Sequence, residues 1–440
     1  MRLLPFIFLL WLTQVSPHLL AQTRHEALFT LHGSNTIGSE LAPRLVQGFL
    51  QGQGYRQVII KPGNLSNETR VEALTPSSNQ TVAVIIEAHG TATGFGALKQ
   101  NPTDIAMASR AINSEELRGL SQLGNMRSFS SEHIIAIDGV AVIVHPHNPL
   151  AELTLDQLAA IFSGHITNWA ELGGANAEIH LYARDGNSGT ADTFKSLVLS
   201  DQPSLSGDAQ LFESNRALAD AVAKDENGIG FVGLAAIAQC KPLAIGQSGV
   251  DALKPEQIAI ATEDYLLSRR LYLYSADQPE GSLPARFLRY VHGAEAQALV
   301  AKSGFVSQTP IAMQVRPDDG PAEYLALVKD AQRLSVNIRF HEGSAELDNK
   351  AKHDIERLIQ LAKTEAFRHR KLLLVGFGDQ QQTDDRALVL SRLRAITVKA
   401  ELHANGIRVA PVAGFGAANP VAANTGSARL RNQRVEVWVL

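Results

Sequence analysis

The stretch Arg184-Asp185-Gly186-Asn187-Ser188-Gly189-Thr190 combines a cation, two glycines and two hydroxyls within seven residues. It follows the apolar run 179–183 and precedes a helical pattern. Glycines let backbone N–H groups converge, and the following helix would direct its positive end to the same point. Arg184 would add a bidentate contact to an oxyanion, with the two hydroxyls as neutral donors. The stretch predicts an anion-binding turn between a strand and a helix; the alternative is a plain turn in which Ser188 caps the helix.

Two further turns rich in glycine and hydroxyl residues follow the same plan. Residues 32–38 come after an apolar strand pattern at 27–31, and residues 91–98 open another helical stretch. Doubly wound α/β folds bind ligands where such turns converge. The turn at 32–38 lacks the Lys of a P-loop, so a nucleotide site is not indicated. Together the three turns predict a shared anion site in an α/β fold.

Composition limits the classes of protein to which the chain can belong. With 440 residues and 45% hydrophobic content it can bury more than one core, so we expect two or three domains. The net charge of -4 gives no indication of nucleic-acid binding, although residues 331–440 carry 17 Lys and Arg against 11 Asp and Glu. The single cysteine, Cys240, rules out an intramolecular disulfide and is expected to be a small buried residue. We expect no cofactor.

The N-terminus has the pattern of a secretory signal peptide, expected over 1–21. A basic residue at position 2 precedes the apolar run 3–12, and Leu-Leu-Ala follows at 19–21. The apolar run is too short to span a bilayer. We therefore expect cleavage after Ala21 and export to the periplasm, with attachment to the cell wall or outer membrane through binding.

Four segments in a fixed order identify a family. They are residues 138–144 (Asp-Gly-Val-Ala-Val-Ile-Val), the helical pattern 153–162 with the Ser-Gly and Asn-Trp pairs after it, the turn 184–190, and residues 228–234 (Gly-Ile-Gly-Phe-Val-Gly-Leu). The combination closely resembles the periplasmic phosphate-binding proteins that serve ABC transporters, over roughly 25–315. The resemblance implies two α/β lobes joined by hinge strands, with inorganic phosphate or a similar oxyanion in the cleft and an ABC permease as a potential partner.

The resemblance also implies which residues would hold the phosphate. In the family the anion is dehydrated and receives hydrogen bonds from three turns, two in one lobe and one in the other. On this sequence those positions are Thr36, Ile37, Thr93, Arg184, Ser188, Gly189 and Thr190.

One position departs from the family pattern and bears on selectivity. Many members have an Asp after the Ser of the strand near 109, where it accepts a proton from phosphate and thereby rejects sulfate. This chain has Arg110 there. A second cation would raise the affinity for any oxyanion but removes that proton test. Asp138 is a candidate substitute acceptor, and the choice between phosphate and another oxyanion stays open.

The path of the chain between the lobes can also be predicted. We expect crossings near 110–140 and 235–265, with returning strands from 250–261 and 269–274 and a terminal helix over 285–300. Residues 316–321 (Arg-Pro-Asp-Asp-Gly-Pro) cannot form a helix or a central strand. They open a predicted linker, 316–332, which ends in a helical stretch from 322.

The remaining segment has a new pattern. Strands at 338–340, 371–376 and 435–440 alternate with helices that follow the turn 344–348 and span 386–405. This small α+β layout, β-α-β-α-β, resembles the OmpA-like peptidoglycan-binding domain over roughly 333–440. The matching motifs are Gly376-Phe377-Gly378-Asp379, Leu390-Ser391 with Arg394-Ala395, Gly414-Phe415-Gly416 with Pro420 and Asn424, and Asn432-Gln433-Arg434-Val435-Glu436.

The second resemblance implies a peptidoglycan site. In the family, an Asp and the Arg fifteen residues later grip the carboxylate and amine of diaminopimelate in the stem peptide; Asp379 and Arg394 have that spacing, with Arg434 as a supporting contact. A zwitterionic amino acid needs an anion and a cation close together. Without the motif, the pair would be read as a surface ion pair. The chain departs from the family at Gly378, Ala387 and Gln433.

These patterns favour a non-enzymatic receptor. The His-Pro-His run at 145–147 is expected to be a turn and not a metal site, and the Gly-Asn-Ser-Gly run lacks the spacing of an esterase nucleophile elbow. The leading hypothesis is a periplasmic receptor for phosphate or a related oxyanion, tethered to peptidoglycan. The alternative is a structural or adhesive envelope protein, important for envelope integrity or biofilm, whose two-lobe domain does not serve transport. A phosphatase is a third, weaker hypothesis.

Overall fold

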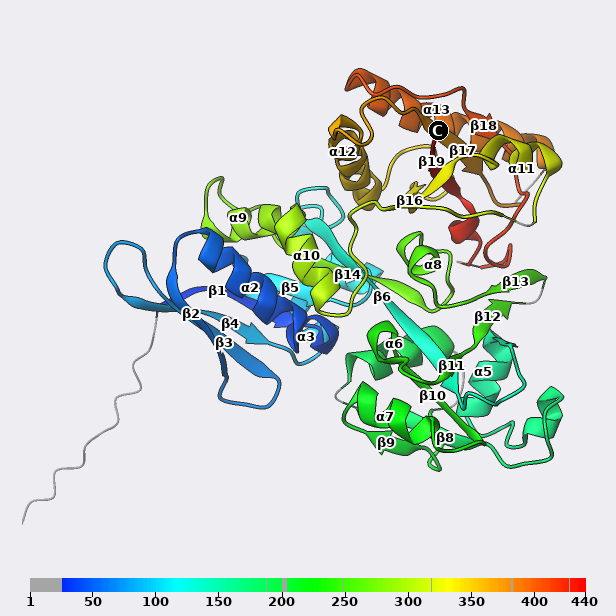
Figure 1. Cartoon of the computed structure of the whole chain (residues 1–440). Helices are drawn as coiled ribbons and strands as arrows, with labels where there is room; N and C mark the ends of the chain where they lie inside the picture. Colours follow the sequence, from blue (N-terminus) through cyan, green and yellow to red (C-terminus); the bar gives the residue numbers. More distant parts are fainter. Residues whose placement is uncertain are drawn as a thin grey trace, which may run out of the picture.

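The computed structural model describes residues 26–186, 188–199, 204–247, 249–317, 319–380, 383–426 and 428–440. The predicted signal peptide, 1–21, lies outside the described residues. Two lobes and a C-terminal domain meet around the centre of the molecule (Figure 1). The predicted two-lobed α/β fold with hinge strands, followed by a small α+β domain, is confirmed. Among the described residues, no helix combines the length and the apolar character that a membrane span requires.

The first lobe is an α/β layer built from the N-terminal strands. β1 pairs in parallel with β4 and β5, whereas β2 and β3 add antiparallel strands at the edge. The apolar face of α2 packs on this sheet through Leu45 and Phe49, as their spacing predicts. The strands and helices of this lobe are β1 (Glu26–Gly33), α1 (Asn35–Gly38), α2 (Leu41–Gly52), β2 (Arg56–Pro62), β3 (Glu68–Leu74), β4 (Thr81–Glu87), α3 (Thr91–Gln100), β5 (Ile105–Ala108), α4 (Ser114–Gly119), α9 (Leu283–Tyr290) and α10 (Ala294–Lys302).

Two strands carry the sheet from one lobe to the other. β6 (Glu132–Val144) pairs with β14 (Ser268–Tyr274) along its first half and with β10 (Gly228–Gly233) along its second. Almost every residue of β6 is buried, which explains its unbroken apolar pattern. The predicted return at 269–274 is confirmed. Residues 250–261, predicted as a returning strand, instead form β13 (Val250–Leu253) and the short helix α8 (Gln257–Ala261), because tertiary packing outweighs the β-branched pattern.

The second lobe surrounds an aromatic core. Phe194 of α6 stacks on Phe231 of β10 at 4.0 Å, and Phe162 of α5 meets both rings edge-on. The predicted helix after Thr154 is confirmed, and the side chains of Thr154 and Gln157 form a capping box. The elements of this lobe are β7 (Glu152–Thr154), α5 (Leu155–Phe162), β8 (His180–Arg184), α6 (Gly189–Val198), β9 (Gln210–Phe212), α7 (Asn215–Val222), β10, β11 (Lys241–Pro242), β12 (Ala244–Gln247) and β13.

The C-terminal domain has the predicted β-α-β-α-β order. Its sheet runs β15-β16-β19-β17-β18, with β19 antiparallel to both of its neighbours. β15 already pairs with β16, so the chain joins this sheet before the predicted linker 316–332. The helix in that segment, α11, packs on the sheet through Tyr324 beside Trp438. The elements are β15 (Ala312–Met313), α11 (Ala322–Val328), β16 (Gln332–Arg339), α12 (Asn349–Lys363), β17 (Leu372–Phe377), α13 (Asp384–Ala404), β18 (Ala413–Gly414) and β19 (Arg434–Val439).

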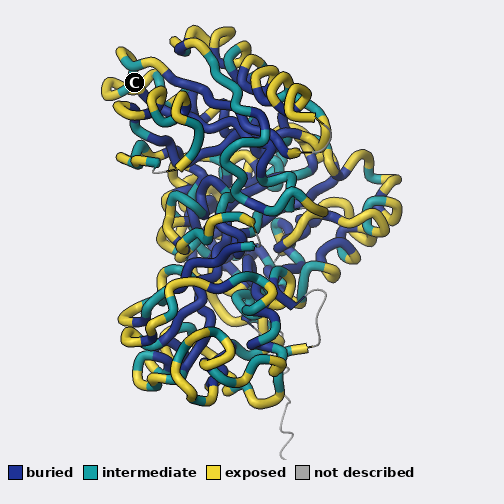
Figure 2. Tube along the Cα trace, turned by 90° about the vertical axis from the view of Figure 1, so that its right-hand side faces the viewer, coloured by how far each residue is buried: buried dark blue, intermediate teal, exposed yellow. Residues whose placement is uncertain are grey.

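The C-terminal domain is held against the two-lobe domain by polar contacts around the loop that follows α8. Arg431 donates five hydrogen bonds to groups in residues 263–268. Arg339 pairs with Asp264 at 3.0 Å, and Arg270 of β14 pairs with Asp348 at 2.7 Å. Buried backbone continues across this joint in the burial-coloured trace (Figure 2). The two domains therefore form one packed body.

Candidate functional site

A cavity of about 330 Å³ lies where the two lobes meet. Residues from the α1 end of the first lobe, from the α6 end of the second lobe and from the hinge strand β6 contribute to its wall. Of the residues predicted to bind phosphate, six line it. They are Thr36, Asp138, Arg184, Ser188, Gly189 and Thr190.

The predicted turn at 184–190 positions the N-terminus of α6 at this cavity. Ser188 is the N-cap residue, and its Oγ accepts hydrogen bonds from the backbone N–H groups of Thr190 at 3.2 Å and Ala191 at 3.4 Å. The helix is ten residues long, so its N-terminus presents a partial positive charge. The helix-cap interpretation is therefore correct, and the capped helix end faces the cavity. Binding of an anion at this end of α6 remains a prediction.

Arg184 is held at the wall of the cavity by two backbone carbonyls of the second lobe. Its Nε donates to the carbonyl of Phe212 at 3.1 Å, and its Nη2 donates to that of Glu213 at 2.6 Å. Burial lowers the pKa of Arg184, and the nearby charge of Asp185 opposes that shift. An arginine lowered from so high a pKa is still a cation at neutral pH. The cavity therefore has a fixed positive charge on one side.

A second cation in the cleft is Arg269, which sequence reasoning missed. Its Nη2 donates to Thr36 Oγ1 at 2.8 Å and to the carbonyl of Gly189 at 2.9 Å, so one guanidinium bridges both lobes. Its Nε lies 3.3 Å from Asp138 Oδ2, which also accepts from Thr193 Oγ1 at 2.8 Å. The side chain is only 9% exposed. The sequence did contain a hint of this role, because Arg269 opens the predicted strand 269–274. A cation in a buried hinge strand needs an acidic or polar partner.

The lobes touch at the centre of the cleft. A Cβ added to Gly189 would lie 2.4 Å from Thr36 Oγ1 and 2.5 Å from Thr36 Cα, which is closer than any real contact. Glycine at this position therefore permits α1 and α6 to meet end to end. The two lobes are therefore in direct contact beside the cavity.

The side chains of three predicted residues do not line the cavity. The Ile37 side chain is buried in the core of the first lobe, although Ile37 directly follows Thr36 in α1, and a contact through its backbone stays a prediction. Thr93 donates its hydroxyl hydrogen to the carbonyl of Gly90 at 2.8 Å, within its own turn. Arg110 makes two hydrogen bonds to Glu116, at 2.7 and 2.8 Å, and lines a separate surface pocket. In this structure the Arg110 guanidinium is paired with Glu116, outside the interlobe cavity, and its predicted role in anion binding stays a prediction.

The predicted peptidoglycan residues Asp379 and Arg394 line a small pocket of the C-terminal domain. Asp379 accepts a hydrogen bond from Arg429 Nη1 at 2.8 Å. Arg394 is 1% exposed, and it donates to Gln433 Oε1 at 2.7 Å and to the carbonyl of Ser344 at 3.0 Å. Its Nη1 is buried with no hydrogen-bond partner. The pocket thus combines a carboxylate with a guanidinium that has donor capacity left.

Two further arginines, Arg434 and Arg429, lie outside the lining of this pocket and have different roles. Arg434 does not line it, because its guanidinium lies over the Phe377 ring at 4.2 Å and pairs with Glu436 at 3.1 Å. It therefore supports the sheet beneath the pocket. Arg429, which orients Asp379, was missed by the sequence analysis.

The weaker sequence signals have structural explanations. His145 Nδ1 accepts from the backbone N–H of His147 at 3.2 Å in a turn after β6, as predicted. Cys240 is buried, and its thiol donates to the carbonyl of Ala219 at 3.1 Å. Burial, with a contribution from Asp220, raises the pKa of Cys240 to about 11, so the thiol stays protonated and unreactive.

Comparison with known proteins gives a family match for each of the two domains. Residues 68–295 match the family described as PBP superfamily domain, and residues 339–434 match the OmpA family. The phosphate-binding protein PstS of Borreliella burgdorferi is 24% identical over 234 residues, which cover 52% of this chain and 81% of that protein. The PstS protein of Bacillus subtilis is 26% identical over 232 residues, 52% of this chain and 73% of that protein.

Among solved structures, an ABC-type phosphate transport receptor from Vibrio cholerae aligns with a TM-score of 0.49 and 23% identity, over 63% of this chain and 99% of its own. These relatives are named as phosphate-binding proteins or transport receptors. The PBP match covers just over half of the chain, and the strand order and hinge described above agree with it. The chain therefore belongs to the PBP superfamily and joins a phosphate-binding-protein-like domain to a C-terminal domain of the OmpA family.

Proposed function

We propose that the two-lobe domain binds inorganic phosphate or a related oxyanion without converting it, and that the C-terminal domain tethers the protein to peptidoglycan in the periplasm. The observation that carries the first part is that Arg184 and the capped N-terminus of α6 line one interlobe cavity, while Arg269 donates to two of its lining residues, Thr36 and Gly189. A guanidinium group and a helix end at the cavity, with a second guanidinium directly behind its wall, are suited to a dehydrated anion.

Ligand entry requires Arg269 to change partners. Its guanidinium now donates to Thr36 Oγ1 and to the Gly189 carbonyl. In the bound state an anion takes the place of these acceptors, and the Thr36 hydroxyl becomes a donor to it. Binding thus exchanges contacts between the lobes for contacts through the anion, and the lobes open to admit the ligand and close over it.

Calorimetry with inorganic phosphate tests this proposal directly. Arg184→Ala is expected to weaken binding roughly 10- to 100-fold, because a hydrogen bond to a charged group contributes about 1.5–3 kcal/mol. Arg286→Ala is a matched control, since Arg286 is exposed on α9 and does not line the cavity. An unchanged dissociation constant for Arg184→Ala, or no binding by the parent protein at millimolar phosphate, would contradict the proposal.

Selectivity rests on Asp138 in this proposal. Its Oδ2 already accepts from Arg269 and Thr193, so its other oxygen is the acceptor for the proton of a phosphate ion. Sulfate has no such proton at neutral pH. A competition titration of phosphate against sulfate across pH is expected to favour phosphate, and Asp138→Asn is expected to reduce that preference. Equal competition by sulfate would remove Asp138 from this role.

The tether is proposed from the pocket formed by Asp379 and Arg394. The unpartnered Nη1 of Arg394 would donate to the carboxylate of diaminopimelate, and Asp379 would accept from its amine. Pull-down on isolated sacculi is expected to retain the parent and to lose both Asp379→Ala and Arg394→Ala. The control is Arg392→Ala, an exposed position on the same helix. Equal retention of all four proteins would count against the pocket.

A second function is favoured by one specific observation. Arg269 and the close approach of Thr36 and Gly189 connect the two lobes directly. A domain whose lobes are joined by such direct contacts would serve as a structural or adhesive part of the envelope and would need no ABC permease. Loss of phosphate uptake on deletion supports transport, whereas loss of envelope integrity or biofilm with normal uptake supports the structural role.

A further inference from the structure

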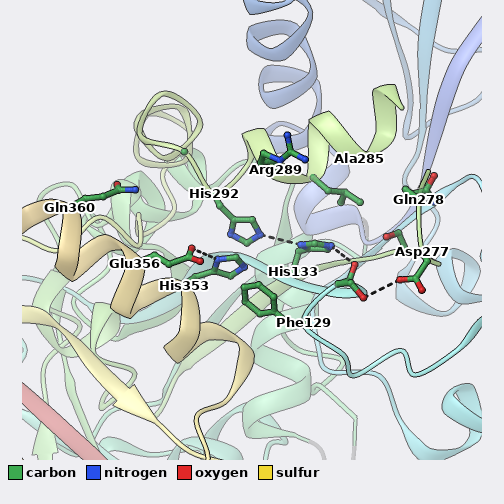
Figure 3. A pocket seen from close by; sticks show the side chains of 14 residues that line it. Phe129, His133, Asp277, Gln278, Ala285, Arg289, His292, His353, Glu356 and Gln360 are labelled. Carbon is green, nitrogen blue, oxygen red and sulfur yellow. Dashed lines mark hydrogen bonds and ion pairs between the residues drawn. The ribbon is translucent and has the colours of Figure 1, made fainter. Parts of the chain in front are cut away.

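Three histidines from distant parts of the chain meet at the joint between the two domains. His133 lies on β6, His292 follows α9, and His353 lies on α12 of the C-terminal domain. One ring nitrogen of each lies within 4.8 Å of the others. They line a cavity of about 570 Å³, and the close-up shows the three rings grouped beside one another (Figure 3).

The outer sides of two rings are fixed by hydrogen-bond acceptors. His133 Nε2 lies 3.1 Å from the carbonyl of Ser130, and His353 Nδ1 lies 3.1 Å from Glu356 Oε2. Each acceptor holds the ring hydrogen on that side, so the lone pairs of His133 Nδ1 and His353 Nε2 face inward. His353 Nε2 is buried and has no hydrogen-bond partner, and His353 itself is 9% exposed. Histidine ligands of metal ions have this arrangement, with an acceptor behind the ring.

The protonation state also suits metal binding. Burial lowers the pKa of His133 to about 4 and that of His292 well below its ordinary value, and repulsion between the protonated forms of the histidines adds to the shift. Burial likewise lowers the pKa of His353, although Glu356 opposes the shift. The three imidazoles are therefore neutral at pH 7, and neutral imidazole is the form that coordinates a metal.

We propose that His133, His292 and His353 bind one divalent transition-metal ion of the class that prefers imidazole, such as Zn²⁺ or Ni²⁺. Three nitrogen ligands with an open position for water form a known type of zinc site, whereas Mg²⁺ and Ca²⁺ require oxygen ligands. Two ligands come from the two-lobe domain and one from the C-terminal domain. The ion therefore joins the domains as well as occupying the cavity.

Binding requires a local rearrangement that the geometry defines. His133 Nδ1 and His292 Nε2 are 3.2 Å apart, close to the spacing of two nitrogens on a tetrahedral ion. The His292 and His353 rings, however, stack at 3.8 Å with an angle of 22°. Nitrogens of stacked rings point in parallel, so the His353 ring must tilt out of the stack to share the ion. Phe129, at 4.4 Å from that ring, packs on it and moves with it.

Nearby charges partly balance the ion. Arg357 lies 3.5 Å from His292 Nδ1 and repels a cation, but it is already paired with Asp354 at 2.9 Å. Lys350 also pairs with Asp354. The carboxylate of Glu356 lies behind His353. When His292 Nε2 coordinates, the single ring hydrogen of His292 moves from Nε2 to Nδ1 by exchange with solvent, so Arg357, whose Nη2 lies 3.5 Å from Nδ1, must shift away.

Titration of the full mature chain with Zn²⁺ tests the site. The parent is expected to bind one ion per chain and to gain thermal stability, and Mg²⁺ is expected to give neither effect. His353→Gln is expected to weaken Zn²⁺ binding at least 100-fold, and Glu356→Gln roughly tenfold, because that carboxylate only orients the ligand. The double variant His145→Gln/His147→Gln, which removes a half-buried and an exposed histidine just after β6, is the control and should bind as the parent does.

Three outcomes would overturn the proposal. They are no binding by the parent up to millimolar Zn²⁺, equal affinity in His353→Gln, and loss of binding in the His145/His147 control with retention in His353→Gln. If His353→Gln does not fold, His292→Gln takes its place, because His292 lies in the turn after α9 outside any strand. The Co²⁺ absorption spectrum of the parent is a second readout, and three imidazole ligands in a tetrahedral field are expected to give intense visible bands that Glu356→Gln retains.

Discussion

The interface between the lobes and the interface between the two domains are built from neighbouring residues of β14, yet they differ in construction. Between the lobes, one guanidinium, that of Arg269, makes the bridging hydrogen bonds beside a cavity. Between the domains, three arginines contact acidic side chains and backbone carbonyls. They are Arg270, Arg339 and Arg431, and a ligand would have to replace the contacts of all three to separate the domains. A single bridging group beside open volume can be replaced by a ligand. Many interlocking groups are harder to replace, so under the proposed function we expect the lobe interface to open and the domain interface to stay closed.

The largest expected effect belongs to the domain interface. Arg431→Ala removes five hydrogen bonds and leaves buried carbonyls of residues 263–268 without donors. We expect a loss of about 3 kcal/mol in the free energy of unfolding, measured by denaturant titration. Arg408→Ala, an exposed position in the same domain, should change it by less than about 0.5 kcal/mol. Equal stability of both variants would mean that the domains are not held here.

The domain interface should also weaken in acid. Burial disfavours the charge of Glu263, but Arg270, Lys350 and Arg339 outweigh it and hold the pKa of Glu263 well below its ordinary value of 4.5. The unfolded chain then binds the proton more readily than the folded chain, so this contribution is complete above about pH 4.5 and is lost as the pH falls further. Thermal unfolding scans from pH 6 to pH 3 should show it, and Glu263→Gln should flatten this part of the profile. An unchanged profile would contradict the assignment.

A smaller effect is expected at the lobe interface. Arg269→Met removes the bridge and should lower the free energy of unfolding by about 2 kcal/mol. The loss is not larger because Asp138 keeps its hydrogen bond from Thr193. The lobes should separate, which small-angle scattering would detect as an increased radius of gyration. Arg286→Met, on the exposed face of α9, is the size-matched control. Unchanged scattering would show that other contacts keep the cleft closed.

The smallest effect on stability is expected for Gly189→Ala. The added methyl would contact the Thr36 backbone, and opening the lobes relieves this contact without unfolding either one. We expect the free energy of unfolding to fall by less than about 1 kcal/mol. We also expect a larger radius of gyration and weaker phosphate binding. Gly186→Ala provides the control in the same turn, since a Cβ there meets nothing within 4 Å. If both variants scatter like the parent, the contact does not limit closure.

Local patterns predicted the α/β class, several individual elements and the turn at 184–190, whereas the family resemblances supplied the two-lobed architecture and the other cleft residues. The caps at Thr154 and Ser188 were visible because capping residues act within a few positions of the helix that they begin. The apolar run of β6 was visible because a strand buried on both faces has a continuous pattern. Helix α8 was not, because its short β-branched segment is ambiguous without its tertiary neighbours.

The residues that were missed act over long sequence separations. Arg269 meets Thr36 and Gly189 only after both lobes have folded, and His133 and His292 are 159 residues apart, so no motif links them. Arg110 is the opposite case. Its partner Glu116 is six residues away in a capping box with Asn113, and this local competition for the guanidinium was open to prediction. For the side-chain partner of Arg110, the local sequence was more informative than its position in the family pattern.

Strand β14 places its consecutive arginines on opposite faces, since side chains alternate along a strand. Arg269 reaches the cleft, and Arg270 reaches Asp348 of the C-terminal domain. In mechanical terms, an extended backbone is nearly inextensible over two residues. If the lobes open as proposed, a displacement of Arg269 would therefore also displace Arg270 and its contact with Asp348.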